Sequence, residues 1–512
     1  MAREPLSHQH VPRRPHAAGQ SLILVILIAA LAAVAWASHF PQESDWNTLP
    51  SAESLVRLAE ADCRKNEFRT GERMGWPLSL LAEARAYQGN HADATEMARS
   101  LSSPWNTVAA ANNWRIQYEK TGNKAELPAA FDVIDDTFLR FEVATILAIA
   151  GQIEEAERIL ADDEDSRIAT TLFIDFYSKL AEAQLRQGSK QSVAASLIRA
   201  THFVDQLRYP MTFTRVRDMV RVANCWTKID ELERGKQIVA DLEAVIRQRH
   251  SAGEATSLLA TGVASLAKFW EVNQIHDRAD AGFQEALQIA AEELRAQQAE
   301  ATETSRFYSE HAAETYAKIG KLQFESGRKS EGTATFEVAV SKLAIVEDLK
   351  TRNYRATHVA GLWAEAGDFE GVKRFIPQIQ IPYYRCKTYC DCGEIAAKTD
   401  AAAAKEFLAI ALRLCETELE PKDQGFVYSD LGEHFATVGD LDRSRYCFEK
   451  AIDAAKKFDP PALAWIARGQ VRVGMFGDAF KTIGGISDRS IRLLPFAELA
   501  LETTKLERTK KE

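Results

Sequence analysis

The feature that most constrains the fold is a phrase that recurs along the chain every 29 to about 53 residues. Each copy is a stretch rich in small residues, then in most copies a Gly with one or two polar residues, then a second stretch with an early Ala. Intervals of this size are typical of helical arrays, in which each unit buries its core by stacking on its neighbours. The turns between the two stretches fall at positions 89, 122, 151, 188, about 229, about 274, 327, 367, about 399, 439 and 474.

Within each copy the apolar residues recur at spacings of three and four, the helical period, and no stretch after residue 50 alternates as a strand does. Gly fits the end of the first helix, because the residue there needs a positive φ that Gly reaches without strain. Small residues let paired helices approach closely. The sequence therefore predicts an all-α chain, an α-solenoid of stacked antiparallel helix pairs over residues 51–486. Three copies have no Gly at the turn: 223–230, 264–274 and 395–400.

One copy carries a resemblance to a known family. Residues 425–456 have Leu431-Gly432 in the first helix, Gly439-Asp440 at the turn, and Phe448 and Ala451 in the second helix. This pattern resembles the tetratricopeptide repeat, and in a degenerate form the resemblance covers most of residues 75–485. The spacing is less regular than in that family and the closing Pro is mostly absent, so a neighbouring solenoid class stays open for part of the chain. The resemblance implies a scaffold that binds peptides or proteins, and it names no ligand.

The N-terminal region predicts a membrane anchor. Residues 21–37, SLILVILIAALAAVAWA, carry no charge. As a helix they would span about 25 Å, slightly less than the roughly 30 Å of a bilayer core. Arginines precede this segment, and Glu43 and Asp45 follow it. The positive-inside rule then places residues 1–20 in the cytoplasm and the chain after the linker 38–50 outside it.

A cleaved signal peptide is the alternative for the same segment, and a buried helix of a cytosolic protein is a more distant one. Ala35-Trp36-Ala37 fits a cleavage site for small residues. Both the anchor and the signal peptide export the repeat region, so an extracytoplasmic, periplasmic location is expected. The absence of any N-x-Ser/Thr sequon fits a bacterial source.

Composition excludes several classes of protein. The chain has 512 residues, a formal charge of −10, 46% hydrophobic residues and 27% charged residues. This balance excludes wholesale disorder, and a single long apolar run excludes a polytopic membrane protein. A nucleic-acid partner is not expected, because such proteins carry a basic excess.

A second recurring feature is an Arg near the start of the first helix of several copies. We expect these residues to make ion pairs or carbonyl contacts between repeats. The alternative is a row of arginines along the concave face that holds an acidic ligand. The residues are Arg140, Arg217, Arg355, Arg385 and Arg492.

The residue types that carry chemistry form no convincing constellation. Seven cysteines, Cys63, Cys225, Cys386, Cys390, Cys392, Cys415 and Cys447, are an odd number and do not indicate a disulfide framework. We expect small buried thiols, with one disulfide or a metal site near Cys386, Cys390 and Cys392 as alternatives. The histidines are isolated, and no phosphate-binding loop or nucleophile elbow occurs. No catalytic, cofactor-binding or metal residue is therefore assigned.

The last segment, 487–512, is expected to be a solvated capping helix with a charged tail, because its end is rich in Lys. Most of the scattered tryptophans, Trp76, Trp226, Trp270, Trp363 and Trp465, are expected to be packing residues. The resulting hypothesis is a membrane-anchored extracytoplasmic scaffold for an unidentified protein or peptide partner, without catalysis or cofactor. The alternatives are an exported enzyme or enzyme subunit with its active site in the groove, and a purely structural envelope protein.

Overall fold

The computed structural model describes residues 49–66, 75–101, 153–160, 167–186, 188–206, 213–253, 256–300 and 311–510, with isolated residues between 109 and 148. Every regular element in these ranges is a helix, which confirms the all-α prediction. The predicted membrane segment 21–37 and the tail 1–20 lie outside the described residues. Among the helices that are described, none is both long enough and apolar enough to span a membrane.

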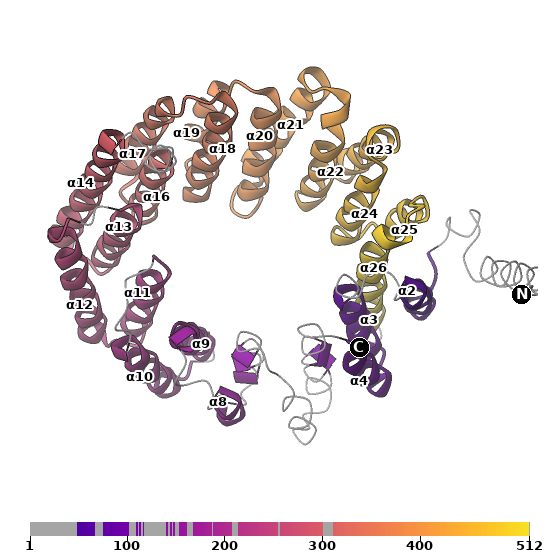
Figure 1. The fold of residues 1–512 in the computed structure, drawn as a ribbon, viewed down its shortest axis with the longest axis horizontal. Helices are drawn as coiled ribbons and strands as arrows, with labels where there is room; N and C mark the ends of the chain where they lie inside the picture. Colours follow the sequence, from indigo (N-terminus) through magenta and orange to yellow (C-terminus); the bar gives the residue numbers. More distant parts are fainter. Residues whose placement is uncertain are drawn as a thin grey trace, which may run out of the picture.

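The helices form two concentric layers around a ring (Figure 1). The inner helices are α3 (Gly75–Tyr87), α9 (Arg167–Arg186), α11 (Phe213–Lys228), α13 (Ser257–Val272), α16 (Ala312–Glu325), α18 (Leu349–Ala366), α20 (Pro382–Ala397), α22 (Pro421–Thr437), α24 (Leu463–Arg472) and α26 (Arg489–Thr509). The outer helices are α2 (Ala52–Asn66), α4 (His91–Ser100), α8 (Ile153–Leu160), α10 (Lys190–Gln206), α12 (Leu232–Ser251), α14 (His276–Glu300), α17 (Lys329–Lys342), α19 (Phe369–Phe375), α21 (Ala401–Glu418), α23 (Leu441–Phe458) and α25 (Phe476–Gly484). Short 3-10 turns follow or precede some of them, at Leu343–Ile345, Ile376–Gln378 and Pro460–Ala462.

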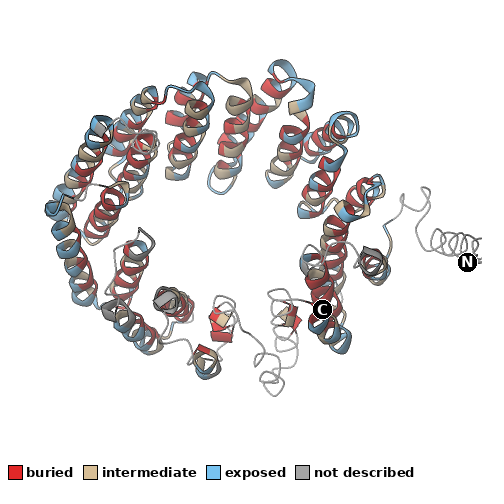
Figure 2. Cartoon of the chain, in the orientation of Figure 1, coloured by how far each residue is buried: buried red, intermediate tan, exposed pale blue. Residues whose placement is uncertain are grey.

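Stacking follows the order of the sequence. From α9 to α26 each inner helix packs against the next inner helix in the sequence, and most also pack closely on the outer helix that follows, as α22 does on α23. Buried residues lie where the layers face each other, and exposed residues line the outer side (Figure 2). These contacts confirm the predicted antiparallel helix pairs.

The turns explain why the phrase is built as it is. Six turn glycines have φ between 77° and 95°, in the left-handed region. In two copies without Gly, Asp230 (φ 70°) and Gln274 (φ 62°) hold the same conformation. The turn expected near 399 is built differently, because the Asp400 side chain caps α21 by accepting from the backbone N–H groups of Ala402 and Ala403. The six glycines are Gly89, Gly188, Gly327, Gly367, Gly439 and Gly474.

Small residues inside the pairs allow close contact between helices. A Cβ atom added to Gly332 of α17 would lie 2.8 Å from the carbonyl oxygen of Gly320 in α16. Real Cβ atoms do not tolerate that distance, so both positions require the smallest residue. Most described apolar side chains from residue 141 to residue 486 form one continuous core between the layers.

The last helix closes the array on its beginning. α26 packs against both α2 and α3, and one apolar core combines Leu55 and Leu81 with Phe480, Phe496 and Leu499. α26 is therefore not the solvated cap that its Lys-rich end suggested. The sequence interpretation missed this because the partners of α26 lie some 400 residues earlier in the chain, where no local pattern points to them.

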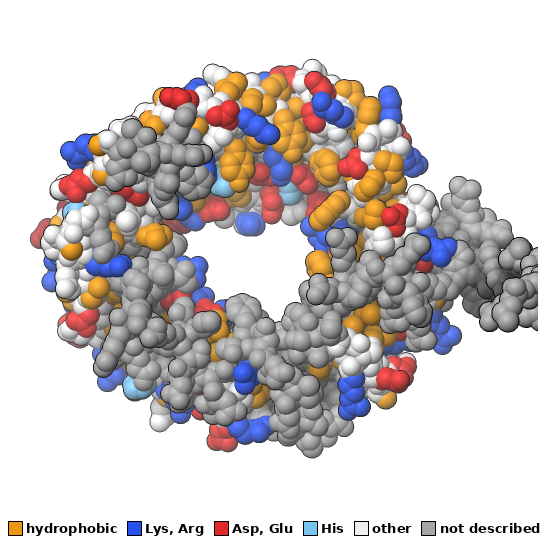
Figure 3. All heavy atoms as spheres, in the orientation of Figure 1, with side chains coloured by type: hydrophobic (Ala, Val, Ile, Leu, Met, Phe, Trp, Pro, Cys, Tyr) orange, Lys and Arg blue, Asp and Glu red, His pale blue; other side chains and the backbone are white. Residues whose placement is uncertain are grey.

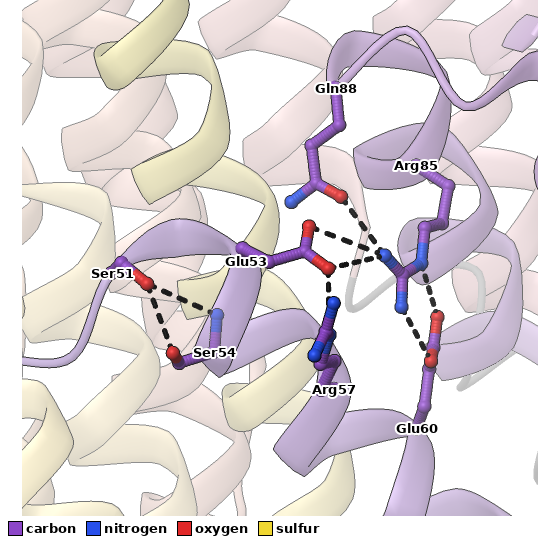
Figure 4. A network of polar contacts seen from close by, with 7 residues as sticks. All are labelled: Ser51, Glu53, Ser54, Arg57, Glu60, Arg85 and Gln88. Carbon is purple, nitrogen blue, oxygen red and sulfur yellow. Dashed lines mark hydrogen bonds and ion pairs between the residues drawn. The ribbon is translucent and has the colours of Figure 1, made fainter.

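Polar contacts reinforce the same seam. Arg492 of α26 and Asp62 of α2 form a buried ion pair at 2.8 Å, and the Ala52 N–H donates to Glu507 at 2.9 Å. Within the first repeat, Arg85 of α3 donates to Glu60 of α2 through Nε at 2.7 Å and Nη2 at 2.8 Å, and also contacts Glu53 (Figure 4). The N-terminal helices are thus fixed to each other and to the C-terminal helix.

Candidate functional site

The inner face of the ring carries the candidate site, a groove that crosses α9, α11, α13 and α16. Its volume is about 970 Å³. Its floor and walls include the apolar side chains of Leu172, Val220, Phe269, Val272 and Leu322. Val272, at the end of α13, is 60% exposed although it is apolar. Four consecutive repeats therefore contribute to one open, partly apolar surface.

Ion pairs between neighbouring inner helices shape this groove. Arg221 of α11 reaches back to Glu182 (2.8 Å) and Asp175 (3.2 Å) of α9. Lys268 of α13 pairs with Glu325 of α16 at 2.6 Å. Because each pair joins adjacent repeats, these charges fix the spacing of the repeats as well as the electrostatics of the groove.

The groove has a small positive excess. Arg217 is largely exposed and pairs at 3.2 Å with Asp218, whose own side chain is buried. Burial raises the pKa of the Asp218 carboxyl. Lys228 is exposed at the end of α11. Five basic side chains line the groove against three acidic ones: Lys179, Arg217, Arg221, Lys228 and Lys268, with Asp175, Glu182 and Asp218.

The five recurrent arginines do not line up as one ligand-binding row. Arg355 pairs with Glu314 of the preceding inner helix at 2.9 Å, and Arg492 pairs with Asp62 at the seam. Arg385 contacts Glu418 and donates to the Ile379 carbonyl at 3.2 Å. Contacts between repeats were the expected role, and Arg355 and Arg492 confirm it. The ion pair of Arg385 instead joins α20 to α21 within one helix pair. Arg217 alone among them lines the groove, and Arg140 is half-buried.

A second set of charged groups lies on α20, α22 and α24. Lys387 pairs with Asp430 of the next inner helix at 3.0 Å. Burial raises the pKa of Glu433 to about 7, and Arg472, at 3.1 Å, offsets only part of this effect because its side chain is more than half exposed. Burial also lowers the pKa of His434, although Glu394 and Asp430 act in the opposite direction. At neutral pH this imidazole is uncharged.

The cysteines behave as small core residues. Cys225, Cys386, Cys390, Cys392, Cys415 and Cys447 are all buried free thiols. The Cys386 thiol donates to the Ala411 carbonyl at 3.1 Å. Burial raises the pKa of Cys225 to about 11, so the one thiol that lines the groove is not a thiolate at neutral pH. Within the described ranges no disulfide joins Cys386, Cys390 or Cys392.

The possible metal ligands and the tryptophans do not form a further site among the described residues. In the part of the chain that the structure describes, no three His, Cys, Asp or Glu side chains are placed to hold a metal ion. Trp226, Trp270 and Trp363 are buried, as expected of packing residues, whereas Trp76 and Trp465 are 40% and 58% exposed. Three of the five are therefore packing residues, which confirms the expectation for most of them.

Sequence reasoning did not single out most of the groove residues, although a signal was present. Asp175, Lys179 and Glu182 recur at i, i+4 and i+7, and so do Arg217, Arg221 and Asn224 on the next inner helix. This spacing puts each trio on one helical face. A polar stripe on the first helix of consecutive copies would have identified the groove.

Comparisons with known proteins find similar folds and no close relative. No protein-family model matches the chain, and no curated protein matches it. The chain is similar to the structure of Ton1535 from Thermococcus onnurineus NA1, at 14% identity over 70% of this chain and 98% of that one, with a TM-score of 0.31. It is also similar to a circular tandem repeat protein, at 13% identity over 90% and 97% of the two chains, with a TM-score of 0.21.

A third similar structure is a Rap protein complexed with competence and sporulation factor, at 11% identity over 78% of this chain and 98% of that one, with a TM-score of 0.24. At these identities and scores, none of the three identifies a residue or a partner of this chain. The architecture itself consists of helix pairs of about one repeat length, with left-handed turns and small residues at the contacts between helices. The chain is an α-helical repeat protein, a solenoid of stacked antiparallel helix pairs.

Proposed function

We propose that this protein is a membrane-anchored, extracytoplasmic scaffold that holds a peptide segment of a partner protein in the groove of α9, α11, α13 and α16, with no catalysis of its own. The observation that carries the proposal is the groove itself. Four consecutive inner helices line it, and its volume is about 970 Å³. Helical arrays bind extended segments along such inner surfaces.

The lining also suggests the character of the segment. Apolar side chains such as Val272 and Leu322 offer contact area, while five basic groups outnumber three acidic ones. A segment with apolar residues and a net negative charge complements this surface. Arg217 and Lys228, at the exposed side of α11, are the cations best placed to meet carboxylates.

Site-specific photo-crosslinking tests the groove. A benzophenone amino acid in place of Val272 is expected to capture one discrete partner in cells. The same replacement at Ile198, which is 54% exposed on the outer helix α10, is the matched control. The double variant Arg217→Glu and Lys268→Glu should abolish the Val272 adduct. Equal adducts from both positions, or a Val272 adduct that survives the charge reversals, would contradict the proposal.

The location is proposed on the sequence of residues 21–37, with the N-terminus in the cytoplasm and residues 51–512 outside it. Protease added to intact spheroplasts of a bacterial host should remove a C-terminal tag, whereas a tag on a cytoplasmic protein stays intact. Retention of the C-terminal tag until lysis would contradict the topology. The mass of the recovered chain separates an anchor from a signal peptide cleaved after Ala37.

A further inference from the structure

The exposed aromatic side chains are concentrated on one rim of the ring. Six aromatic residues are exposed in the described part of the chain, and five of them lie in the first two turns of an inner helix or at the end of an outer one. The inner helices run parallel to one another, so their first turns share one rim. The five are Trp76, Tyr354, Phe426, Phe458 and Trp465, and with the half-buried Tyr383 and Tyr384 they form what we call the aromatic rim.

Contacts link this rim from one repeat to the next. The ring centroids of Tyr354 in α18 and Tyr384 in α20 are 6.4 Å apart. The Arg468 guanidinium of α24 lies 5.1 Å from the Trp465 ring and 5.4 Å from the Trp76 ring of α3. It is held by an ion pair with Glu498 of α26 at 2.7 Å. Figure 3 shows hydrophobic side chains along the arc of α18, α20, α22 and α24.

Charge on this rim is balanced. Asp348 and Lys350 both lie near Tyr354 in the sequence, and near Phe426 the Glu420 carboxylate pairs with Lys422 at 2.9 Å. Such a surface does not select a polyanion or an anionic lipid layer, because neither sign of charge is in excess. The complementary partner is a segment of low charge that offers flat apolar faces.

The start of the described chain lies on the opposite rim. Glu53, at the start of α2, contacts Arg85, near the end of α3. Because α2 and α3 are antiparallel, the chain enters where the inner helices end. If the chain is anchored as proposed above, the aromatic rim therefore faces away from the membrane, where a partner can reach it.

The spacing of the aromatic side chains favours one conformation of partner. Packed helices lie about 8–10 Å apart, and α18, α20, α22 and α24 each present an aromatic side chain on this rim. A polyproline II helix advances about 9.3 Å in each three-residue turn. The Tyr354 and Tyr384 rings, 6.4 Å apart, fit within one such turn, and aromatic-lined surfaces are the known mode of recognition for this helix.

We propose that the aromatic rim binds a proline-rich segment in the polyproline II conformation, with successive turns over Tyr354 and Tyr384, Phe426, and Trp465. The ion pair of Arg468 with Glu498 holds the guanidinium beside the two indole rings, so Trp465 and Trp76 are preordered for contact. This surface is separate from the groove proposed above, and its partner need not be the same molecule.

Fluorescence anisotropy with a labelled oligoproline of about 15 residues, roughly five turns, tests the proposal on the full chain in detergent micelles. A Gly-Ser peptide of the same length is the reference. The triple variant Tyr354→Ala, Phe426→Ala and Trp465→Ala should weaken oligoproline binding by about tenfold or more. Tyr446→Ala, which removes an exposed aromatic side chain from the second turn of outer helix α23, at the opposite end of that helix from Phe458, should leave it unchanged.

Two further readouts separate this proposal from others. A peptide with Pro at every third position should bind more tightly than one of the same length with the same number of Pro residues at irregular positions. The groove variant Lys268→Glu should not affect oligoproline binding, so failure of one proposal leaves the other standing. Oligoproline binding no tighter than Gly-Ser binding, or unchanged in the triple variant, overturns the proposal. So does rim-dependent binding to phosphatidylcholine vesicles without oligoproline binding, which would make the rim a lipid surface.

Discussion

Arg492 of α26 donates hydrogen bonds to both carboxylate oxygens of Asp62 in α2, at 2.9 and 3.1 Å, although the two residues are 430 positions apart. Only 9% of the Arg492 side chain and none of the Asp62 side chain is exposed. A charge buried without its partner is strongly unfavourable. This pair therefore ties the correct folding of the C-terminal helix to that of the N-terminal one.

The first prediction concerns this pair. Asp62→Ala leaves the Arg492 guanidinium buried without its carboxylate, and should lower the free energy of unfolding by about 3–5 kcal/mol. Urea unfolding followed by circular dichroism measures the change. Arg57→Ala, which breaks a pair with Glu53 from a side chain that is 73% exposed, is the control and should change stability by less than about 0.5 kcal/mol. The double variant Asp62→Leu and Arg492→Met should stay near the wild type, because no charge is left buried alone. A wild-type midpoint for Asp62→Ala would contradict this account of the seam.

The second prediction compares two helical glycines. Gly332→Ala forces a methyl group to within 2.8 Å of the Gly320 carbonyl and should destabilise the protein by about 1–3 kcal/mol. Gly361→Ala lies inside α18 with no atom within 4 Å of the added carbon, and should stabilise it by about 0.5–1 kcal/mol, because Ala favours the helix. Thermal unfolding measures both. Shifts of the melting temperature in the same direction would show that the paired helices do not approach as closely as described.

The third prediction concerns pH and Glu433. Burial raises the pKa of this carboxyl from 4.5 to about 7, so between these values the folded chain holds a proton that the unfolded chain has released. Stability from this group is complete below about pH 4.5 and is lost as pH rises through 7, by about 3 kcal/mol at most. The loss between pH 5 and pH 7.5, measured by urea unfolding, should be smaller in Glu433→Gln by about 2 kcal/mol, because part of the total is already lost at pH 5. If the two proteins show the same pH dependence, the carboxyl titrates near its ordinary value.

The helix pairs could be predicted because their signals are local. Spacings of three and four set the helices, and the repeat interval located turns even where Gly is missing, at Asp230 and Gln274. A residue other than Gly is strained at positive φ, so its identity does not indicate such a turn. Only the spacing of the neighbouring copies indicated these two turns. Roles of side chains at the contacts between repeats, such as Arg355 with Glu314, followed from the same periodicity.

The closure and the aromatic rim could not be predicted in the same way, whereas the polar stripes on α9 and α11 do give the groove a local signal. No sequence pattern near Asp62 predicts its contact with Arg492, because this contact depends on the curvature of the whole array, which brings α26 to α2. Trp465 and Trp363 both occur in inner helices, yet one is exposed and the other buried. Their difference in exposure depends on where each residue lies around and along its helix. An error of a few residues in the predicted helix boundaries would assign the wrong one to the surface.

Closure also sets an order for folding during synthesis. α26 leaves the ribosome after every other described helix, so Leu55 and Leu81 lack their C-terminal partners until it emerges. A flexible chain of that length would lose about 5 kcal/mol or more in entropy on joining its ends. An array that is already curved brings α2 and α26 close before they touch, so the intermediate repeats must fold first. A chain that ends before Arg489 would stay an open arc with an apolar N-terminal edge, ready to take up α26 from another copy.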